Sequence, residues 1–437
     1  MAYDIIIGRD KSDIKKFGNR GLVFIGKGYV TMGNYTSLSN NIWLDVARSH
    51  VIMIAGKRGS GKSYTLAAIA EELCDLEKDI AQNIAPLIFD TMGIFWTMKY
   101  KNEKETELLQ EWDLKPKNLP VNIWVPYGFY KEYESRNIPV DNAFAIKPSE
   151  LNAEDWLSVF NIDITNENGI LIQKVLAGLK ELERDFDIDT ITEAIQNETA
   201  EEKIKNGAIS LFQAAKSWGV FAQRGQKGTK ISELIEAGKT NILDISCYSS
   251  IGRFNVRALV IGLVCKRLFT ERMLERKKEE MLALEHGQDY LNQKKKQNPL
   301  VWIFIDEAHE FLPKENQEKT AASDALIQIL REGRQPGISL VMATQQPGVI
   351  HRDAMTQSDI VISHRLTAQP DIEALNSIMQ TYLLESIRQS MSDLPGLKGS
   401  AIILDDNSER IYPIRVRPRF TWHGGETPSA INVKKKV

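Results

Sequence analysis

The stretch His50–Ser63, HVIMIAGKRGSGKS, decides the fold of this chain. Its first part, His50–Ala55, is a short continuous apolar run, which is typical of a strand buried on both faces. A turn with three glycines follows, and the residues Ser63–Leu76 favour a helix. A strand, a glycine-rich turn and a helix are therefore predicted in this order.

The glycine-rich turn, Gly56–Ser63, has the complete spacing of a P-loop. Phosphate oxygens need a concave row of backbone N–H donors, and glycines let the chain fold tightly without side chains in the way. Because a helix N-terminus also favours an anion, the turn predicts an ATP site in which Lys62 reaches the β- and γ-phosphates and the Ser63 hydroxyl binds Mg²⁺. The alternative is a glycine-rich turn without function, and the strand and helix on either side argue against it. The residues expected to contact the nucleotide are Gly56, Gly59, Ser60, Gly61, Lys62, Ser63 and Tyr64.

A second apolar run, VWIFI at 301–305, carries two acids at its end. Asp306 is placed to hold Mg²⁺ through water, and Glu307 to act as the general base that polarises the attacking water. The alternative is an ordinary strand that ends in exposed acids. The P-loop in the same chain favours the catalytic interpretation.

The run Ser339–Gln345, SLVMATQ, predicts a buried strand that brings Gln345 to the same edge of the sheet. An amide at this place is suited to orient the attacking water or to contact the γ-phosphate. Gln346 is disfavoured because the alternation of side chains along a strand turns it away.

Two arginines, Arg331 and Arg334, lie three residues apart in a predicted helix over 322–334, and so on neighbouring parts of one helix face. Phosphoryl transfer gains from an arginine that meets the developing negative charge, and that arginine can come from another subunit. The alternative is that both are surface arginines. Arg365, which follows the run Ile360–His364, is a weaker candidate for the same role.

Further apolar runs predict an α/β fold: a mainly parallel sheet flanked by helices, forming one RecA-like P-loop core. The stretch Lys99–Lys239 has a mostly helical pattern, with helix caps expected at Asn152 and Thr190. The expected organisation is a small N-terminal β segment at 1–48, an ATPase core at 49–98 and 240–418, a mainly helical insertion at 99–239 and a C-terminal tail at 419–437. The remaining strand-like runs are Tyr3–Ile7, Gly21–Ile25, Tyr29–Met32, Asn41–Val46, Pro86–Asp90, Thr240–Ile245 and Ile360–His364, and Val256–Leu284 is a further helical stretch.

Composition sets limits on compartment and partners. The chain has 55 Lys and Arg against 58 Asp and Glu, so the formal net charge of −3 neither supports nor excludes binding to nucleic acid. The three cysteines are dispersed, which argues against a metal cluster and for reduced thiols inside a cell. No apolar run is long enough to cross a bilayer and the N-terminus does not resemble a signal peptide, so no membrane contact and a cytoplasmic location are expected.

Four segments resemble the HerA-like branch of the HerA/FtsK family of motor ATPases. They are AGKRGSGKSYT, WIFIDEAHEFLP, FDTMGIFW and ILREGRQPGISLVMATQQPGVIHRDAMTQSDIVISHR, and the resemblance extends over Asn41–Pro418. It implies a hexameric ring that hydrolyses ATP with Mg²⁺ and pulls double-stranded DNA through its centre, often together with a nuclease of the NurA type. It implies the same roles for Lys62, Ser63, Asp306, Glu307, Gln345 and either Arg331 or Arg334, and it places Asp90 near the site.

Other interpretations remain beside this one. The chain could be a regulatory or scaffolding ATPase subunit of an anti-phage defence complex, where the ring holds an effector. A small-molecule kinase or GTPase is disfavoured, since no lid-like segment and no NKxD motif is present. The DEAH tetrad at 306–309 also occurs in two-lobed helicases, but only one P-loop lobe is evident. Because a single lobe has no internal partner to supply an arginine, a homo-oligomer, most simply a hexamer, is predicted.

One departure from the family bears on ring stacking and nuclease docking rather than on ATP hydrolysis. The first fifty residues are fewer than the N-terminal β-barrel of full-length family members requires.

Overall fold

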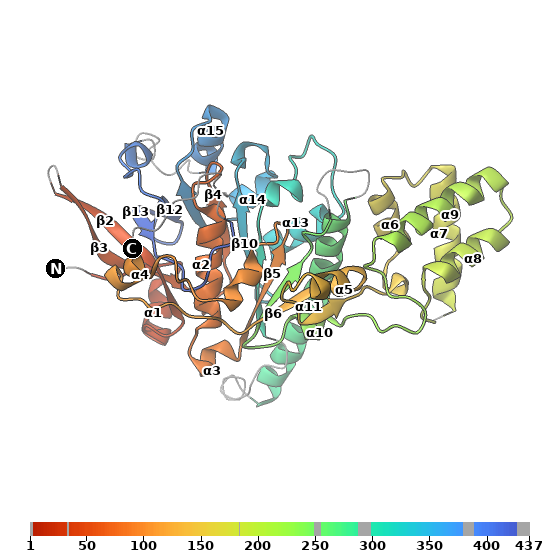
Figure 1. Ribbon diagram of the computed structural model, residues 1–437, viewed down its shortest axis with the longest axis horizontal. Coiled ribbons are helices and arrows are strands. Elements are labelled where there is room, and N and C mark those ends of the chain that lie inside the picture. The colour runs from red at the N-terminus through yellow and green to blue at the C-terminus, as the bar shows by residue number, and fades with distance from the viewer. Residues whose placement is uncertain are drawn as a thin grey trace.

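A computed structural model of the chain describes residues 3–32, 35–182, 184–248, 255–286, 299–378 and 389–425. The last part of the expected tail, 426–437, lies outside the described residues. Within them, thirteen strands form one sheet in the order β1-β3-β2-β13-β12-β11-β4-β10-β9-β5-β8-β6-β7. Figure 1 shows this sheet running through the molecule with helices on both sides.

Six neighbouring strands at the centre of the sheet are parallel to one another. Each coincides with an apolar run that the sequence predicts to be a buried strand, and nearly all of their residues are buried. The prediction of a mainly parallel sheet flanked by helices is confirmed. In spatial order these strands are β11 (Ile360–His364), β4 (Val51–Ala55), β10 (Ile338–Thr344), β9 (Leu300–Ile305), β5 (Ile84–Asp90) and β8 (Thr240–Asp244).

Helices cover both faces of this central sheet. α2 (Lys62–Cys74) packs on one face in an apolar cluster that includes Ile54 of β4. α11 (Val256–His286) and α13 (Ser323–Glu332) pack on the other face in a cluster that includes Met53. Because successive side chains of a strand point to opposite faces, the continuous apolar run of β4 is needed to cover both sides.

Five strands extend the sheet beyond β11. β12, β13, β2 and β3 follow in antiparallel pairs, and β1 lies parallel to β3. The N-terminal β segment is therefore part of the main sheet. The runs Gly21–Ile25 and Tyr29–Met32, predicted as two strands, are one strand with a register shift between them, and β12 and β13 were not predicted. The strands are β1 (Ile5–Ile7), β2 (Leu22–Met32), β3 (Tyr35–Asp45), β12 (Ser400–Asp405) and β13 (Arg410–Val416).

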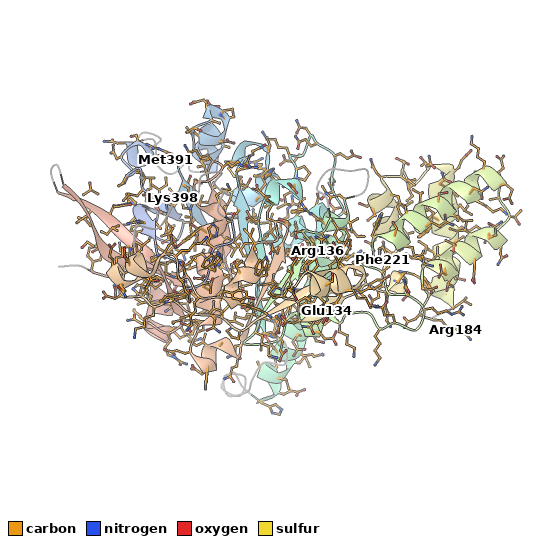
Figure 2. The ribbon with its side chains drawn as sticks, viewed as in Figure 1. Glu134, Arg136, Arg184, Phe221, Met391 and Lys398 are labelled. Atoms are coloured by element: carbon orange, nitrogen blue, oxygen red, sulfur yellow. The ribbon has the colours of Figure 1, made fainter. Side chains whose placement is uncertain are left out.

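The range 99–239 contains the expected helices and also part of the sheet. Four helices form a lobe at one end of the molecule (Figure 1), and Trp156 lies at its centre with ring centroids 4.8–5.5 Å from those of Phe160, Phe212 and Phe221. Figure 2 labels Phe221 where this lobe joins the rest of the chain. Two strands from the same range continue the sheet beside β8. The prediction of a mainly helical insertion therefore holds only for the middle of the range 99–239. The elements are β6 (Val121–Pro126), β7 (Asn142–Phe144), α6 (Ala153–Phe160), α7 (Glu167–Glu181), α8 (Ile188–Asn197) and α9 (Glu202–Ser217).

Of the two predicted helix caps, one is confirmed and one is wrong. Asn152 caps α6 as expected, and it forms a capping box with Asp155. The cap of α8 is Asp187, whose carboxylate accepts hydrogen bonds from the backbone N–H and the hydroxyl of Thr190. The helix begins three residues before the predicted position because aspartate is a better N-cap than threonine.

Shorter elements connect this framework. They are α1 (Lys11–Phe17), α3 (Lys78–Ala81), η1 (Phe95–Lys99), α4 (Thr106–Glu111), α5 (Tyr127–Ser135), η2 (Pro148–Glu150), α10 (Ile231–Leu234), η3 (Ala308–Glu310), η4 (Pro347–Val349), α14 (Arg352–Thr356) and α15 (Gln369–Ile378). In the part of the chain that the structure describes, no helix is both long and apolar enough to span a bilayer. The same part holds no group of three or more His, Cys, Asp and Glu side chains arranged to bind a metal ion.

Candidate functional site

The predicted site residues come together at the carboxyl edge of the central strands. The P-loop lies between β4 and α2, Asp306 and Glu307 follow β9, and Gln345 follows β10. Parallel strands end at a common edge, and open α/β sheets bind their ligands there. The Ser63 hydroxyl is hydrogen-bonded to Asp306, so the first turn of α2 and the end of β9 are in direct contact.

The P-loop backbone is shaped for close packing. A Cβ atom at Gly56 would lie 2.4 Å from Ser60 Oγ and 2.7 Å from Cβ of His364, so only glycine fits there. Gly61, at the start of α2, has φ of +112°, a conformation open to glycine. Ser60 Oγ is buried and has no hydrogen-bond partner among the described residues. Since a buried polar atom needs a partner, this hydroxyl fits a phosphate oxygen.

Lys62 lies in the same cradle. Lys62 is 5% exposed as a whole residue, and its ammonium donates a long hydrogen bond of 3.4 Å to the carbonyl of Lys57. Burial lowers the pKa of Lys62, while the carboxylates of Glu307 and Asp306 act to raise it. A buried ammonium with one weak hydrogen bond is suited to a polyphosphate.

The two acids after β9 have different surroundings. Asp306 is 1% exposed and accepts hydrogen bonds from Ser63 and from the backbone N–H of Glu307, at 2.9 Å in the latter case. Burial raises the pKa of Asp306, although these hydrogen bonds and Lys62 oppose the shift. A carboxylate tied to the Ser63 hydroxyl fits one side of an Mg²⁺ site whose remaining ligands are phosphate oxygens and water.

Glu307 is held in an unusual conformation. Its φ and ψ of 52° and 44° are left-handed, which costs a residue other than glycine about 1–3 kcal/mol. Burial, and next the charge of Asp306, raise the pKa of Glu307 to about 7. Its Oε2 atom is buried without a hydrogen-bond partner among the described residues, and Nδ1 of His309 lies 3.5 Å away. These are properties of a general base that exchanges a proton near neutral pH.

His364 was not predicted, yet it supports the P-loop. It closes β11 and is fully buried. Its Nδ1 donates to the carbonyl of Ser400 at 3.0 Å, so Nε2 accepts from the hydroxyl of Thr65 on α2 at 2.8 Å. Burial lowers the pKa of His364 to about 4, which keeps the ring neutral beside Lys62. A histidine at the end of an otherwise apolar strand was the available signal.

The remaining candidates are Gln345 and the arginines. Gln345 is half-buried and Gln346 is exposed. Arg331 is 58% exposed and pairs with Asp353 on α14 at 2.6 Å. The expectation that Arg334 shares its helix face is wrong, because α13 ends at Glu332 and Arg334 is exposed in the following turn. That turn leads into Pro336, which disfavours continuation of the helix.

Arg365 contacts the P-loop through its backbone. Its carbonyl accepts a hydrogen bond of 3.2 Å from the backbone N–H of Lys57, and its side chain is exposed. The roles of all three arginines stay predictions.

The Tyr64 side chain contacts residues near the C-terminus. Its hydroxyl donates to Glu105 at 2.9 Å and accepts from the backbone N–H of Arg419 at 2.7 Å. Its ring lies edge-on to that of His423, with centroids 5.2 Å apart. Nucleotide contact by Tyr64 stays a prediction, and the contacts that the structure gives its hydroxyl are within the chain.

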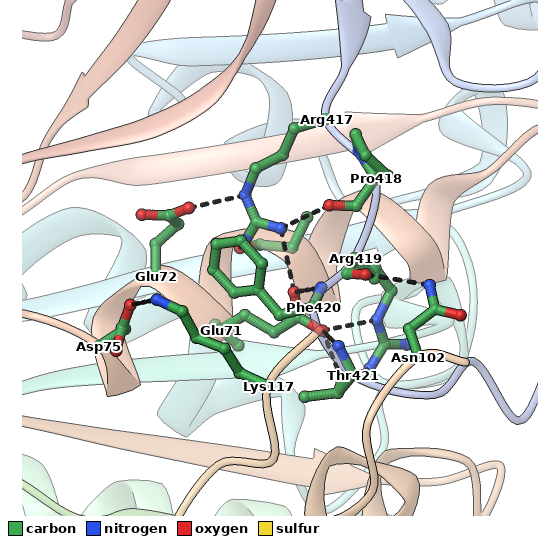
Figure 3. A network of polar contacts seen from close by, with 12 residues as sticks. Glu71, Glu72, Asp75, Asn102, Lys117, Arg417, Pro418, Arg419, Phe420 and Thr421 are labelled. Atoms are coloured by element: carbon green, nitrogen blue, oxygen red, sulfur yellow. Dashed lines mark hydrogen bonds and ion pairs between the residues drawn. The ribbon is translucent and has the colours of Figure 1, made fainter. Parts of the chain in front are cut away.

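Residues 417–421, called the C-terminal strap from here on, are bound to α2 through a buried polar network (Figure 3). Glu71 is fully buried, and its carboxylate accepts from Arg417 Nη1 and Arg419 Nε, both at 3.0 Å. The backbone N–H groups of Phe420 and Thr421 bind the same carboxylate at 2.9 and 3.1 Å. The expected tail thus begins as a packed part of the ATPase core, since residue 419 already belongs to this network.

Asp90 ends β5 at the same edge of the sheet. Its carboxylate accepts hydrogen bonds from four successive backbone N–H groups, at residues 92–95. Burial, and next the charge of Asp244 on the neighbouring strand, raise the pKa of Asp90 to about 7. These bonds fix the turn that leads from β5 into η1.

The fold and the site together define a P-loop ATPase with a RecA-like core. The family described as "Helicase HerA, central domain" matches residues 30–268, which is more than half of the chain, and "ATPase family associated with various cellular activities (AAA)" matches residues 258–366. The chain belongs to the HerA central-domain family of motor ATPases.

Relatives by sequence agree with this membership, and one solved structure shares the fold. A probable helicase of Methanocaldococcus jannaschii is 21% identical over 433 residues, which cover 94% of this chain and 71% of that protein. The DNA double-strand break repair helicase HerA of Sulfolobus acidocaldarius is 24% identical over 83% of this chain and 63% of its own length, so less than two thirds of that relative is matched. VirB4 of Thermoanaerobacter pseudethanolicus has a similar fold, with a TM-score of 0.53, 12% identity and coverage of 90% of this chain and 96% of that one.

Proposed function

We propose that this chain is an ATP-hydrolysing ring motor that translocates double-stranded DNA. The observation that carries the hydrolytic part is Glu307, a partly buried carboxylate whose pKa is raised to about 7 and whose Oε2 has no hydrogen-bond partner among the described residues. It lies beside Asp306 and Lys62 at the one edge of the sheet where the P-loop is found.

In this proposal different residues of the chain bind the phosphates, hold Mg²⁺ and accept the proton. The backbone N–H groups of Gly56–Ser63 and the Lys62 ammonium hold the phosphates of ATP. Ser63 and Asp306 would hold Mg²⁺, which neutralises charge on the β- and γ-phosphates. Glu307 takes the proton from the attacking water as the new P–O bond forms and the bond to the β-phosphate oxygen breaks.

The motor part of the proposal rests on the family and on the incomplete site. Hydrolysis of this kind is fast when an arginine meets the developing charge, and Arg331, Arg334 and Arg365 are all exposed. An exposed arginine can reach a neighbour's site, in the case of Arg331 after leaving its ion pair with Asp353, and the proposed assembly is a homo-hexamer with ATP between subunits. Gln345 would orient the attacking water within each subunit.

The proposed DNA substrate is inferred from the relatives. The Sulfolobus acidocaldarius relative is described as a DNA double-strand break repair helicase, which supports double-stranded DNA as the substrate here. A nuclease of the NurA type or a defence effector is the proposed partner. We propose an ATPase core of 49–98 and 240–418, to which the strap residues up to 421 are bound through Glu71.

The proposal is tested by ATP-dependent displacement of a third-strand oligonucleotide from a DNA duplex, which reports movement along the duplex. Wild-type protein should displace the third strand with ATP, and Glu307→Gln should not. ATP hydrolysis at an equal rate with and without duplex, and no displacement, would support a regulatory ATPase and contradict the motor.

A further inference from the structure

We propose that a pocket beside the C-terminal strap is a second nucleotide-binding site, separate from the P-loop. The cavity has a volume of about 620 Å³. Three aromatic residues form its walls, Trp96, Tyr100 and Trp422, and none of the P-loop residues 56–63 lines it. The proposal goes beyond ATP hydrolysis and does not depend on ring assembly.

A different cavity, of about 320 Å³, lies between the four-helix lobe and α11 and has no part in this proposal; Asn152 and Lys266 help to line it. A volume of about 620 Å³ is within the range of small-molecule sites.

The aromatic walls are fixed by hydrogen bonds of their own. The rings of Trp96 and Tyr100 meet edge to face with centroids 6.0 Å apart, and Trp96 Nε1 donates to the carbonyl of Gly93 at 3.0 Å. The backbone N–H of Trp422 donates to the carbonyl of Tyr100 at 2.8 Å, and its carbonyl accepts from the hydroxyl of Thr97 at 2.8 Å. Because the Trp96 N–H is already bonded, this side chain offers its ring to a ligand, and stacking on such a surface suits any planar base.

Basic side chains surround these rings. Lys99 and Lys101 line the pocket together with Glu103, and the Lys104 ammonium lies 4.2 Å from the centre of the Trp422 ring. Lys99 also pairs with Asp141 at 2.6 Å, whereas the Lys101 residue is exposed at the rim. The lysines suit a phosphate and the rings suit a base. A nucleotide has both, either free in solution or within a single strand of nucleic acid.

The test uses Lys62→Ala protein, in which the P-loop no longer has its phosphate-binding ammonium. Binding of ADP is measured by equilibrium dialysis, and binding of a fluorescein-labelled thymidine oligonucleotide by fluorescence anisotropy at low salt. ADP binding alone identifies a free nucleotide as the ligand, and oligonucleotide binding identifies a strand. Trp96→Ala should weaken the binding roughly 5- to 150-fold, while Trp96→Phe, which keeps a ring, should retain most of it.

The contact between Lys101 and a phosphate is tested by the salt dependence of oligonucleotide affinity. If the oligonucleotide binds, Lys101→Ala should reduce the slope of log affinity against log salt by about 0.7. Tyr3→Ala and Lys203→Ala are the matched controls, since Tyr3 is 65% exposed at the far N-terminal edge and Lys203 is exposed on α9. Both should leave binding unchanged.

Two results would overturn the proposal: neither probe binds to the Lys62→Ala protein, or Trp96→Ala and Tyr3→Ala bind the probes equally well. If neither probe binds and Trp96→Ala also raises the KM for ATP in a chain with Lys62 intact, the pocket serves the P-loop nucleotide instead. Loss of duplex translocation with the pocket intact would instead count against the proposed function alone.

Discussion

Replacing Glu71 by glutamine removes one negative charge from the buried contact between α2 and the C-terminal strap. The carboxylate lies between the guanidinium groups of Arg417 and Arg419, and all three side chains are 0% exposed. Breaking a buried ion pair by removing one partner costs about 3–5 kcal/mol, because the remaining charge stays buried. Glu72 still pairs with Arg417 at 2.7 Å, so we expect the lower part of this range.

Thermal unfolding followed by circular dichroism measures this loss. A change of this size lowers Tm by roughly 6–20 °C in a domain of a few hundred residues. Glu77→Gln, an exposed change on the same side of the molecule, should stay within about 0.5 kcal/mol of wild type. If Glu71→Gln is as stable as Glu77→Gln, the network does not hold the strap to α2.

The effect should also depend on pH. Burial acts to raise the pKa of Glu71, but Arg419 and Arg417 hold it below its ordinary value. A depressed pKa contributes stability that is present above the unfolded value, about 4.3, and is lost as pH falls through the folded pKa. The difference in unfolding free energy between wild type and Glu71→Gln should therefore shrink as pH falls below about 4.

Three further predictions concern the active site and the sheet. Lys62→Ala should abolish ATP hydrolysis in a steady-state phosphate-release assay while the circular dichroism spectrum is unchanged, and wild-type rates would remove Lys62 from the site. Glu307→Gln should bind ATP with near-normal affinity but hydrolyse it about 10²–10⁴-fold more slowly, and wild-type kcat/KM should rise with pH up to about 7, where Glu307 loses its proton. Although burial opposes it, the hydrogen bond that His50 Nδ1 donates to Asp359 at 2.6 Å and the Asp45 carboxylate 3.7 Å from Nε2 raise the pKa of His50 to about 9. The stabilisation by His50 is therefore complete below pH 6.5 and is lost as pH rises through 9; Asp359→Asn should flatten this dependence in urea unfolding.

Local sequence patterns predicted the central strands of the sheet and the residues of the candidate ATP site. The six parallel strands are continuous apolar runs, and the P-loop and Asp306 belong to short motifs whose spacing alone gives their chemistry. β7 is only three residues long and β13 is interrupted by Pro413, so neither carries a clear strand pattern.

Long-range contacts were beyond the reach of these patterns. Arg417 and Glu71 are 346 residues apart, and no spacing rule links them. His364 reaches Thr65 across 299 residues in the same way. The cap of α8 was misplaced for a local reason, since Asp187 and Thr190 compete for the same helix end and the sequence pattern alone favoured the second.

In the proposed motor, each active site is completed by a second copy of the chain. Mixing Arg331→Ala/Arg334→Ala protein with Lys62→Ala protein tests it most directly, with subunit exchange verified by energy transfer between labelled copies. Each variant alone should be inactive, and mixed rings should recover part of the ATPase activity, because some interfaces pair an intact P-loop with intact arginines. Verified exchange without any recovery would contradict trans action by these arginines, and full activity of a dilute monomer would contradict the shared site altogether.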